Sequence, residues 1–444
     1  MRRRPRDPDV LIVGAGPAGS ALAWHLARAG ARVTLVDARR FPRSKACGEC
    51  LSPGATPLLE EVGVADRLRR AHVPRLAGWR LRTPAGVWFG GRFGAAADGG
   101  PASGLAVSRR RLDGLLLDAA LVARAELSAP LRVFDVRTGR DGPYLCARGP
   151  EGSARTLAAR WIVGADGLRS VVARRIVGVR RGPRPRLAIV ARPRHLAEIR
   201  AGTRPAPAMW RPAGLAGELR LSRSGCLGLA PIEEGRWNLT LVAPLTEARA
   251  VARDRIGYFR AASAGYGIRI GDPAPELAAT LEITGPFQVG PRAVTAPGVL
   301  LVGDAAGYFD PLTGQGIFQA LAGARLAAAT ILAALADPAE ADGARAAYAR
   351  ALRRLVRPGR HVQRAIDATI RRPHLIEPLG AWLARRPGLV AHLLDVTGDR
   401  VPAGEFLSPT RLAAALRAPR GDLPPGPFGS AGENAAPEGS DVAA

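Results

Sequence analysis

Three glycines near the N-terminus are spaced as in a turn that binds a phosphate-bearing ligand. The segment GAGPAG places Gly14, Gly16 and Gly19 at the end of the apolar run VLIVG. In such a turn the first glycine permits the tight bend, the second lets the backbone approach a pyrophosphate, and the third lets the next helix pack closely on the strand. The next helix begins at Pro17 and Ala18. The unpaired N–H groups of its first turn and its dipole favour the same anion. The spacing therefore predicts a dinucleotide site.

An acidic residue follows the next apolar strand, roughly 20 residues beyond this turn, where such folds bind ribose. The strand ARVTLVD ends at Asp37. A carboxylate there can accept hydrogen bonds from the adenosine ribose and would repel a 2′-phosphate. We expect Asp37 and its neighbour Ala38 to hold the adenosine end of the ligand. A purely structural glycine turn with a surface aspartate is the alternative, and the strand–turn–helix context disfavours it.

A second glycine-rich segment, VGDAAGYFDPLTGQGIFQA, favours FAD over NAD. Asp304 follows an apolar strand and could bind a ribityl hydroxyl. The turn before the next helix can face the pyrimidine edge of a flavin, where N–H groups and a helix dipole would stabilise the negative charge of the reduced ring. An NAD dehydrogenase has no use for a second site so far along the chain. The residues predicted to form it are Gly303, Asp304, Pro311, Gly314, Gln315 and Gly316.

Four separated motifs together resemble the FAD-dependent superfamily of the aromatic hydroxylases, of the para-hydroxybenzoate hydroxylase type. They are the glycine turn, SRRRLD, VGADGLRS and GDAAG with PLTGQG, and they cover roughly residues 9–330. The resemblance implies that Arg109 contacts the flavin side of the cofactor. It also implies that Gly164, Asp166 and Gly167 lie near the FAD pyrophosphate and, in hydroxylases, near NADPH.

Within this superfamily the sequence is most similar to the geranylgeranyl reductase family. Gly307 stands where typical hydroxylases have histidine, and SKACGECLSPGA resembles the Cys-Gly element that the reductases place near the isoalloxazine. The segment CLGLAPIEEGRWNLTLV resembles their substrate-sheet hairpin and lacks the paired tryptophans of flavin halogenases. Related chains with this element also act as oxidases and hydroxylases of secondary pathways, so the type of reaction stays open.

Cys47 is the candidate catalytic residue. A thiol beside a flavin could protonate a substrate carbon or tune the flavin, whereas a small residue packed under the ring would explain the same position and is the favoured interpretation. Lys45 and Glu49 are expected to fix this loop. Tyr308 could hydrogen-bond to substrate or belong to the core. The dispersed histidines form no metal set, and no metal site is predicted.

These residues require a discontinuous α/β fold. Alternating strands and helices predict a Rossmann-type FAD-binding domain over 1–75, 105–180 and 285–340. Segments of alternating polarity predict an inserted, mostly antiparallel β-sheet substrate domain over 76–104 and 181–284. C-terminal helices are expected over 341–418 and a disordered tail over 419–444.

The strand RWNLTLVA illustrates the inserted sheet. Trp237, Leu239 and Leu241 fall on one face, while Asn238 and Thr240 fall on the other. The preceding EEG is a turn signal, so a hairpin is expected here.

The formal net charge of +26 comes from arginines scattered along the chain, with Lys45 the only lysine. No nucleic-acid motif accompanies them and aromatic residues are few, so no nucleic-acid partner is expected. The alternative outside the enzymes is a basic protein that binds nucleic acid or a membrane surface and uses a nucleotide fold as scaffold; a colourless protein that cannot take up FAD would favour it. The four cysteines form no disulfide framework and no secretory signal is present, so a cytoplasmic setting is expected.

The sequence therefore predicts an FAD-dependent oxidoreductase that acts on a hydrophobic small molecule. In the favoured hypothesis the reduced flavin gives hydride to a carbon–carbon double bond. In the alternative, the enzyme is a monooxygenase that hydroxylates a polyketide or aromatic secondary metabolite with NAD(P)H and oxygen. NAD(P)H is the expected electron donor in either case, and a lipid substrate would imply peripheral contact with a membrane. The oligomeric state stays open.

Overall fold

The computed structural model describes residues 7–95, 100–199, 206–207, 214–417 and 425–428. Its first layer is a six-stranded sheet with the strand order β22-β23-β11-β1-β2-β7, parallel except at β22. The central strand β1 is a buried run of four apolar residues, as expected of a parallel sheet covered on both faces. The strands are β1 (Val10–Val13), β2 (Val33–Val36), β7 (Glu126–Ser128), β11 (Trp161–Gly164), β22 (Thr295–Ala296) and β23 (Val299–Leu301).

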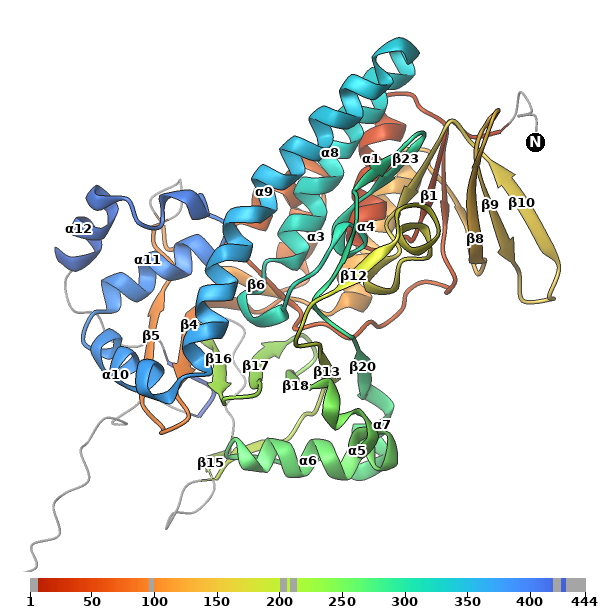
Figure 1. Cartoon of the computed structure of the whole chain (residues 1–444). Helices are drawn as coiled ribbons and strands as arrows, with labels where there is room; N and C mark the ends of the chain where they lie inside the picture. The colour runs from red at the N-terminus through yellow and green to blue at the C-terminus, as the bar shows by residue number, and fades with distance from the viewer. Residues whose placement is uncertain (1–6, 96–99, 200–205, 208–213, 418–424, 429–444) are drawn as a thin grey trace, which may run out of the picture.

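Long helices cover this sheet (Figure 1). Helix α1 (Pro17–Arg28) packs against α4 (Arg109–Val122) and α8 (Gly316–Ala336), and α8 packs in turn against α9 (Ala341–Ile370). Among the described residues, α8 is the one helix long and apolar enough to cross a membrane. However, 61% of its most apolar stretch is buried inside the protein, and its side chains belong to the main hydrophobic core.

The second layer is a nine-stranded sheet with the order β20-β13-β18-β17-β16-β4-β6-β3, to which β5 is added at β4. Its pairs are antiparallel except β16 with β4. The strands are β3 (Cys50–Leu51), β4 (Arg75–Arg82), β5 (Trp88–Arg92), β6 (Gly104–Ala106), β13 (Arg186–Ala191), β16 (Leu215–Leu221), β17 (Cys226–Ile232), β18 (Arg236–Pro244) and β20 (Glu282–Thr284). The predicted hairpin is present as β17 and β18, with Glu234 and Gly235 at positive φ in its turn.

Both faces of this sheet are buried. Trp237, Leu239 and Leu241 pack against α5 (Ala248–Arg253), α6 (Arg255–Gly265) and α7 (Ala274–Thr280). The opposite face, with Asn238 and Thr240, is turned toward the FAD-binding half. Nearly the whole of β18 is shielded from solvent. Its polar residues Asn238 and Thr240 therefore line a cavity and do not form a solvent-exposed face.

Smaller elements complete the chain, and α10–α12 lie together on the left of Figure 1. The helices are α2 (Thr56–Glu61), α3 (Ala65–Arg70), α10 (Pro373–Ala384), α11 (Pro387–Thr397) and α12 (Pro409–Arg417). The strands are β8 (Arg132–Gly139), β9 (Gly142–Arg148), β10 (Ala154–Ala158), β12 (Val179–Arg181), β14 (Leu196–Glu198), β15 (Ala206–Pro207), β19 (Ile268–Ile270) and β21 (Val289–Pro291).

The predicted fold class is confirmed, because a Rossmann-type parallel sheet, an inserted mostly antiparallel sheet and C-terminal helices are all present. The prediction of a disordered tail is wrong at residues 425–428. The Pro425 carbonyl accepts a hydrogen bond from the N–H of Ala216, and the Phe428 ring packs against the inserted sheet beneath Arg220. The apolar ring of Phe428 allows this Pro- and Gly-rich segment to pack against the sheet. The rest of the predicted tail lies outside the described residues.

Candidate active site between the two sheets

The glycine turn after β1 is shaped by two close backbone approaches. A Cβ atom at Gly14, where φ is +102°, would lie 2.5 Å from the carbonyl oxygen of Ala165. A Cβ at Gly19 would lie 1.9 Å from the carbonyl oxygen of Gly14, so α1 can sit this close to β1 only with glycine here. Both positions therefore exclude any larger residue.

Gly16 differs, because its surroundings are open except for two cations. A Cβ at Gly16 would lie 3.7 Å from guanidinium nitrogens of both Arg109 and Arg43. Pro17 and Ala18 follow in the first turn of α1, whose unpaired N–H groups face the same space. Two guanidinium groups over a helix N-terminus are complementary to a diphosphate.

Asp37 lies at the end of β2 beside this turn. Its carboxylate accepts hydrogen bonds from the N–H groups of Ala15 and Arg39, both at 2.9 Å, and lies 3.6 Å from the Arg43 guanidinium. Ala38 is exposed on the rim. The carboxylate thus fixes the glycine turn and the loop after β2 at the same time.

The second predicted segment forms the opposite wall. Gly303 and Asp304 begin a short 3-10 helix directly after β23, and the Asp304 carboxylate lies 4.0 Å from Lys45 Nζ. Pro311 begins a further 3-10 turn that ends at Gly314 in the left-handed conformation, and α8 starts at Gly316. The two glycine-rich segments, hundreds of residues apart, meet across one space.

Gln315 caps the start of α8 and joins this turn to the C-terminal part of the chain. Its amide donates a hydrogen bond to Asp399 at 2.7 Å, and the Ser52 hydroxyl donates to the same carboxyl at 2.8 Å. Burial raises the pKa of Asp399 to about 7, although both hydrogen bonds oppose the shift. The Gln315 side chain is therefore engaged by the protein, and its backbone is what the turn can present to a ligand.

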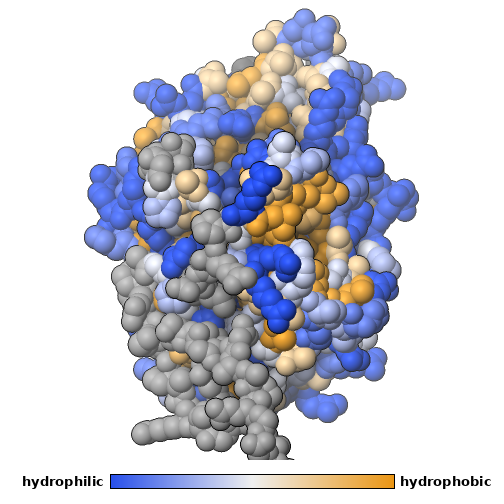
Figure 2. All heavy atoms as spheres, turned by 90° about the vertical axis from the view of Figure 1, so that its left-hand side faces the viewer, coloured by the Kyte–Doolittle hydropathy of each residue, from blue (hydrophilic) through white to orange (hydrophobic). Residues whose placement is uncertain are grey.

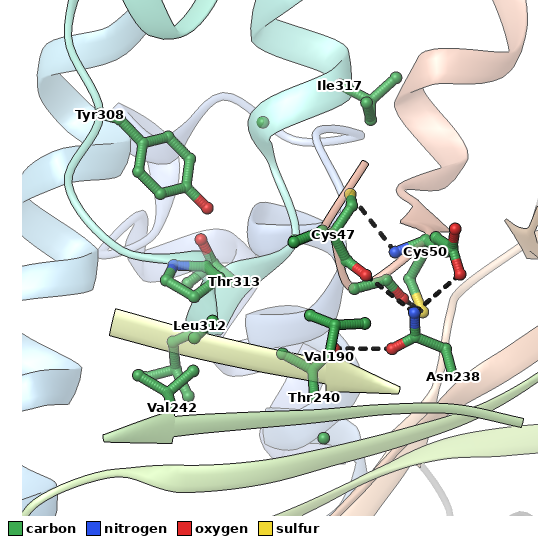
Figure 3. Close-up of a pocket in the computed structure, with 18 of the residues that line it drawn as sticks. Cys47, Cys50, Val190, Asn238, Thr240, Val242, Tyr308, Leu312, Thr313 and Ile317 are labelled. Carbon is green, nitrogen blue, oxygen red and sulfur yellow. Dashed lines mark hydrogen bonds between the residues drawn. The ribbon is translucent and has the colours of Figure 1, made fainter. Parts of the chain in front are cut away.

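A cavity of about 230 Å³ lies between these turns and the inserted sheet. Its walls are mainly apolar and come from β4, β13, β16, β17 and β18, from the end of α9 and from α11. Figure 3 shows Tyr308 directing its hydroxyl into this space, with Cys47 on another side and Asn238 and Thr240 on the strand below. A long or flat apolar molecule fits such walls, with a few polar groups to orient it.

The structure brings most of the predicted site residues to this cavity. Those that line it are Gly16, Pro17, Ala18, Cys47, Arg109, Gly303, Asp304, Pro311, Gly314 and Gly316. Gly14, Gly19, Asp37, Ala38, Asp166 and Gln315 lie outside its lining. Asp166 begins a short 3-10 helix, and its carboxylate accepts the N–H of Val171 at 2.6 Å. Burial raises the pKa of this carboxyl.

Glu49 holds the cysteine loop in place. Its carboxylate is 1% exposed and accepts hydrogen bonds from the Arg192 guanidinium at 2.8 Å, the Asn238 amide at 2.8 Å and the backbone N–H of Arg109 at 2.9 Å. The same Asn238 amide donates to the Cys47 carbonyl at 2.8 Å. The loop is thereby tied to the inserted sheet and to the start of α4.

The Cys47 thiol faces a cation. The N–H of Glu49 donates to Cys47 Sγ at 3.4 Å, and Arg109 lies on its other side. Burial alone would lower the pKa of Arg109, but Asp113 and Cys47 outweigh it and raise the pKa. This arginine therefore stays charged and supplies a fixed positive field between the glycine turn and the thiol.

Tyr308 is the second polar group aimed into the cavity. Burial, followed by the nearby charges of Asp304 and Asp310, raises the pKa of its phenol well above 10. The hydroxyl therefore keeps its proton at neutral pH and can donate a hydrogen bond to a ligand. The side chain combines both options, because it lines the cavity while its ring packs against Phe287.

Three residues of the site were not predicted from the sequence. Arg43 bridges Asp37 and Asp113, Arg192 binds Glu49 and Glu282, and Asp399 reaches the flavin-binding turn from the C-terminal region. Only Arg43 could have been proposed from the sequence, because it lies in the loop between the predicted site residues Asp37 and Cys47. The other two come from parts of the chain without a motif.

The residues present fit FAD. The open space at Gly16, next to two guanidinium groups, suits the diphosphate. The left-handed turn at Gly314 and the start of α8 border the part of the cavity where the isoalloxazine ring would lie. When bound, FAD supplies two-electron redox chemistry. The protein supplies a mainly apolar space, a fixed charge at Arg109 and hydrogen-bond donors at Tyr308 and Lys45.

Comparison with known proteins agrees with this geometry. A family model described as FAD binding domain matches residues 7–357. The chain is 33% identical over 330 residues to a menaquinone reductase of Mycolicibacterium smegmatis, covering 72% of this chain and 75% of that one. It is 28% identical over 358 residues to a digeranylgeranylglycerophospholipid reductase of Methanothermobacter thermautotrophicus, covering 74% and 78%.

A shorter match and a solved structure widen the range of related activities. A 6-methylpretetramide 4-monooxygenase of Streptomyces rimosus is 42% identical over 87 residues, 18% of this chain and 21% of that one. The flavin-dependent halogenase CmlS shares the fold with a TM-score of 0.71 at 20% identity, over 93% of this chain and 78% of that one. Since the family model covers most of the chain, the protein belongs to the FAD binding domain family and is an FAD-dependent oxidoreductase.

Proposed function

We propose that this enzyme reduces a carbon–carbon double bond in an isoprenoid or prenylated quinone lipid. The observation that carries the proposal is the apolar cavity, which runs from the two glycine turns along the inserted sheet to α11. The relatives named as reductases of menaquinone and of a geranylgeranyl lipid support this substrate class.

We assign the cofactor contacts by position. Gly16, Pro17, Ala18 and Arg109 would hold the diphosphate, Asp37 and Ala38 the adenosine ribose, and Asp304 the ribityl chain. Asp166 would lie near the diphosphate, and the turn from Pro311 to Gly316 would face the pyrimidine edge. Gly14, Gly19 and Gly303 would permit these approaches without contributing side chains.

Within the cavity, Tyr308 would orient a polar group of the substrate by donating a hydrogen bond, because its phenol stays protonated. Cys47 is the candidate proton donor. Its thiol lies on the cavity wall, and the product carbon that does not receive hydride must receive a proton. Arg109 beside the thiol would stabilise the thiolate left behind.

The electron donor is proposed to be NAD(P)H, bound transiently. The setting is proposed to be cytoplasmic, with contact to a membrane when the substrate is a lipid and with no nucleic-acid partner.

The product distinguishes reduction from oxygenation. Purified protein with FAD is incubated with NADPH and a menaquinone or a geranylgeranyl lipid, with and without oxygen. We expect product that gains two hydrogens under both conditions. A product that gains one oxygen atom and forms only in air would replace this proposal with the monooxygenase function. The shorter match to a monooxygenase supports that alternative.

Cys47→Ala tests the proton donor, with Cys50→Ala as a control in the same loop. We expect turnover to fall by about 10²-fold or more in the first variant. Cys50 also lines the cavity, but the change there should matter less, because its thiol donates a hydrogen bond to the Gly48 carbonyl and burial raises its pKa, so it keeps its proton. Equal turnover in wild type and Cys47→Ala would show that this cysteine only packs in the loop.

A further inference from the structure

Helix α10 has an apolar face that the rest of the described chain leaves partly exposed. Leu375, Leu379 and Trp382 are 44%, 38% and 42% exposed, and their i, i+4, i+7 spacing puts them on one side of the helix. Leu407 and Leu416, farther along the chain, are also exposed. Half of the large exposed hydrophobic side chains of the described residues therefore lie in this one C-terminal region.

The inner face of the same helix is packed tightly. Ile376 and Gly380 are buried, and a Cβ at Gly380 would lie 2.6 Å from Thr83 and 3.5 Å from the Phe89 ring. The helix is thus fixed on β5 and cannot turn its outer leucines inward. Their exposure is a property of the folded protein.

Arginines flank the outer face at both ends. Arg371 and Arg372 precede the helix, and Arg385 and Arg386 follow it; of these, Arg371 is paired with Asp367 of α9. The one carboxylate of α10, Glu377, points inward and accepts hydrogen bonds from the Thr83 hydroxyl and the N–H of Ala85. The outer face therefore carries apolar side chains between pairs of arginines, without a compensating acid on the helix.

Trp382 and its neighbour add a pattern typical of a membrane interface. The Arg386 guanidinium lies 4.3 Å from the Trp382 ring centroid. Tryptophan and arginine both combine an apolar body with a polar end, which suits the boundary between headgroups and acyl chains. Figure 2 looks onto the side of the molecule that carries α10–α12 and shows hydrophobic residues gathered on part of it, beside hydrophilic ones.

The surface also lies next to the cavity. Ile366 and Ile370 at the end of α9 line the cavity, and so do Val390 and Leu394 of α11. Helix α10 is the segment between these two helices and packs against both of them, although none of its own residues lines the cavity. A bilayer on this face would bring its lipids to the edge of the cavity.

We propose that the outer face of α10, formed by Leu375, Leu379 and Trp382 between flanking arginines, docks on the surface of an anionic lipid bilayer. Docking would combine insertion of three apolar side chains with attraction of the arginines to lipid phosphates. The proposal rests on the proposed function only for the idea that the membrane carries the substrate.

The test is sedimentation of the full FAD-loaded chain with vesicles of phosphatidylglycerol and phosphatidylcholine, or of phosphatidylcholine alone. We expect binding to the anionic vesicles that weakens with added salt and is much lower on neutral ones. Leu375→Gln/Leu379→Gln/Trp382→Gln should lower the partition coefficient at least tenfold, and Arg372→Gln/Arg385→Gln severalfold. The control Leu121→Gln/Val122→Gln changes exposed apolar residues of α4 and should leave binding unchanged.

Retained FAD and an unchanged unfolding midpoint show that each variant is folded. Wild type that does not bind anionic vesicles, or a triple variant that binds them equally well, overturns the proposal. So does self-association of wild type that the triple variant abolishes, because the face would then be a contact between copies. Turnover on detergent-dispersed substrate reports on the proposed reaction separately, so the two proposals can fail independently.

Discussion

The two walls of the active-site cavity are built by different means. The FAD-binding wall uses backbone: the glycines of the turn after β1, the αL turn at Gly314 and the first N–H groups of α1 and α8. The wall formed by the inserted sheet uses side chains from separate strands, held by buried ion pairs such as Arg192 with Glu49 and Arg220 with Glu218.

This difference explains how each wall can vary. The backbone wall tolerates no larger residue at its closest approaches, Gly14 and Gly19. A side-chain wall can change its lining while the scaffold stays, which fits relatives named as reductases and a monooxygenase.

The strongest test of the backbone wall is Gly19→Ala. The added Cβ would lie 1.9 Å from a backbone oxygen, which cannot rotate away, so we expect a loss of more than about 5 kcal/mol in unfolding free energy and no retained FAD. Gly16→Ala is the matched control: its Cβ would meet only guanidinium nitrogens at 3.7 Å, so the apoprotein should fold while FAD affinity falls. Urea unfolding and flavin absorbance measure both, and a Gly19→Ala protein that is stable and yellow would contradict this account.

The corresponding test of the side-chain wall is Glu49→Gln. Removing one partner of a buried ion pair leaves Arg192 with less compensation, and we expect a loss of about 3 to 5 kcal/mol together with lower turnover as the Cys47 loop loosens. The exposed pair of Glu60 with Arg69 serves as control, since Glu60→Gln should cost less than about 1 kcal/mol. Similar unfolding free energies for the two variants would show that the buried pair does not fix the wall.

Where the two walls meet, Asp399 should make stability depend on pH. This carboxyl ionises near pH 4 in the unfolded chain, about its ordinary value, whereas burial raises its pKa to about 7 in the folded protein. The native state therefore binds more protons between these values, and unfolding free energy should fall as pH rises from about 4 to 7, by on the order of 3 kcal/mol.

Asp399→Asn should remove this contribution, because the amide can bond to Ser52 and Gln315 without ionising. Urea unfolding of both proteins at pH 5 and pH 8 measures the difference. A variant with the same pH dependence as wild type would show that Asp399 is not the group responsible.

The smallest expected effect is that of Tyr308→Phe on the cavity side. Loss of one hydrogen bond to substrate should cost about 1 kcal/mol, which raises KM severalfold and leaves FAD content unchanged. Steady-state kinetics with the reducible lipid measure it. Lost FAD or an unchanged KM would place the tyrosine in the cofactor site or in the packing, respectively.

The sequence by itself determined the fold class and the cofactor, and most of the site residues predicted from it line the cavity. The reason is that a site built from backbone requires glycine at positions close together in the sequence. Close backbone contacts around one strand–turn–helix unit require Gly14 and Gly19, and the left-handed conformation of a single turn requires Gly314. The hairpin of β17 and β18 was also predictable, because its turn residues and its alternation are adjacent in the chain.

Only the tertiary structure decided which polar residues face the cavity. Asn238 and Thr240 look like a solvent-exposed face, but α5–α7 cover one side of the sheet and the FAD-binding half covers the other. Arg192, Asp399 and the packed segment 425–428 have partners far away in the sequence. Their roles depend on long-range contacts between buried charges and on packing, which composition and spacing do not encode locally.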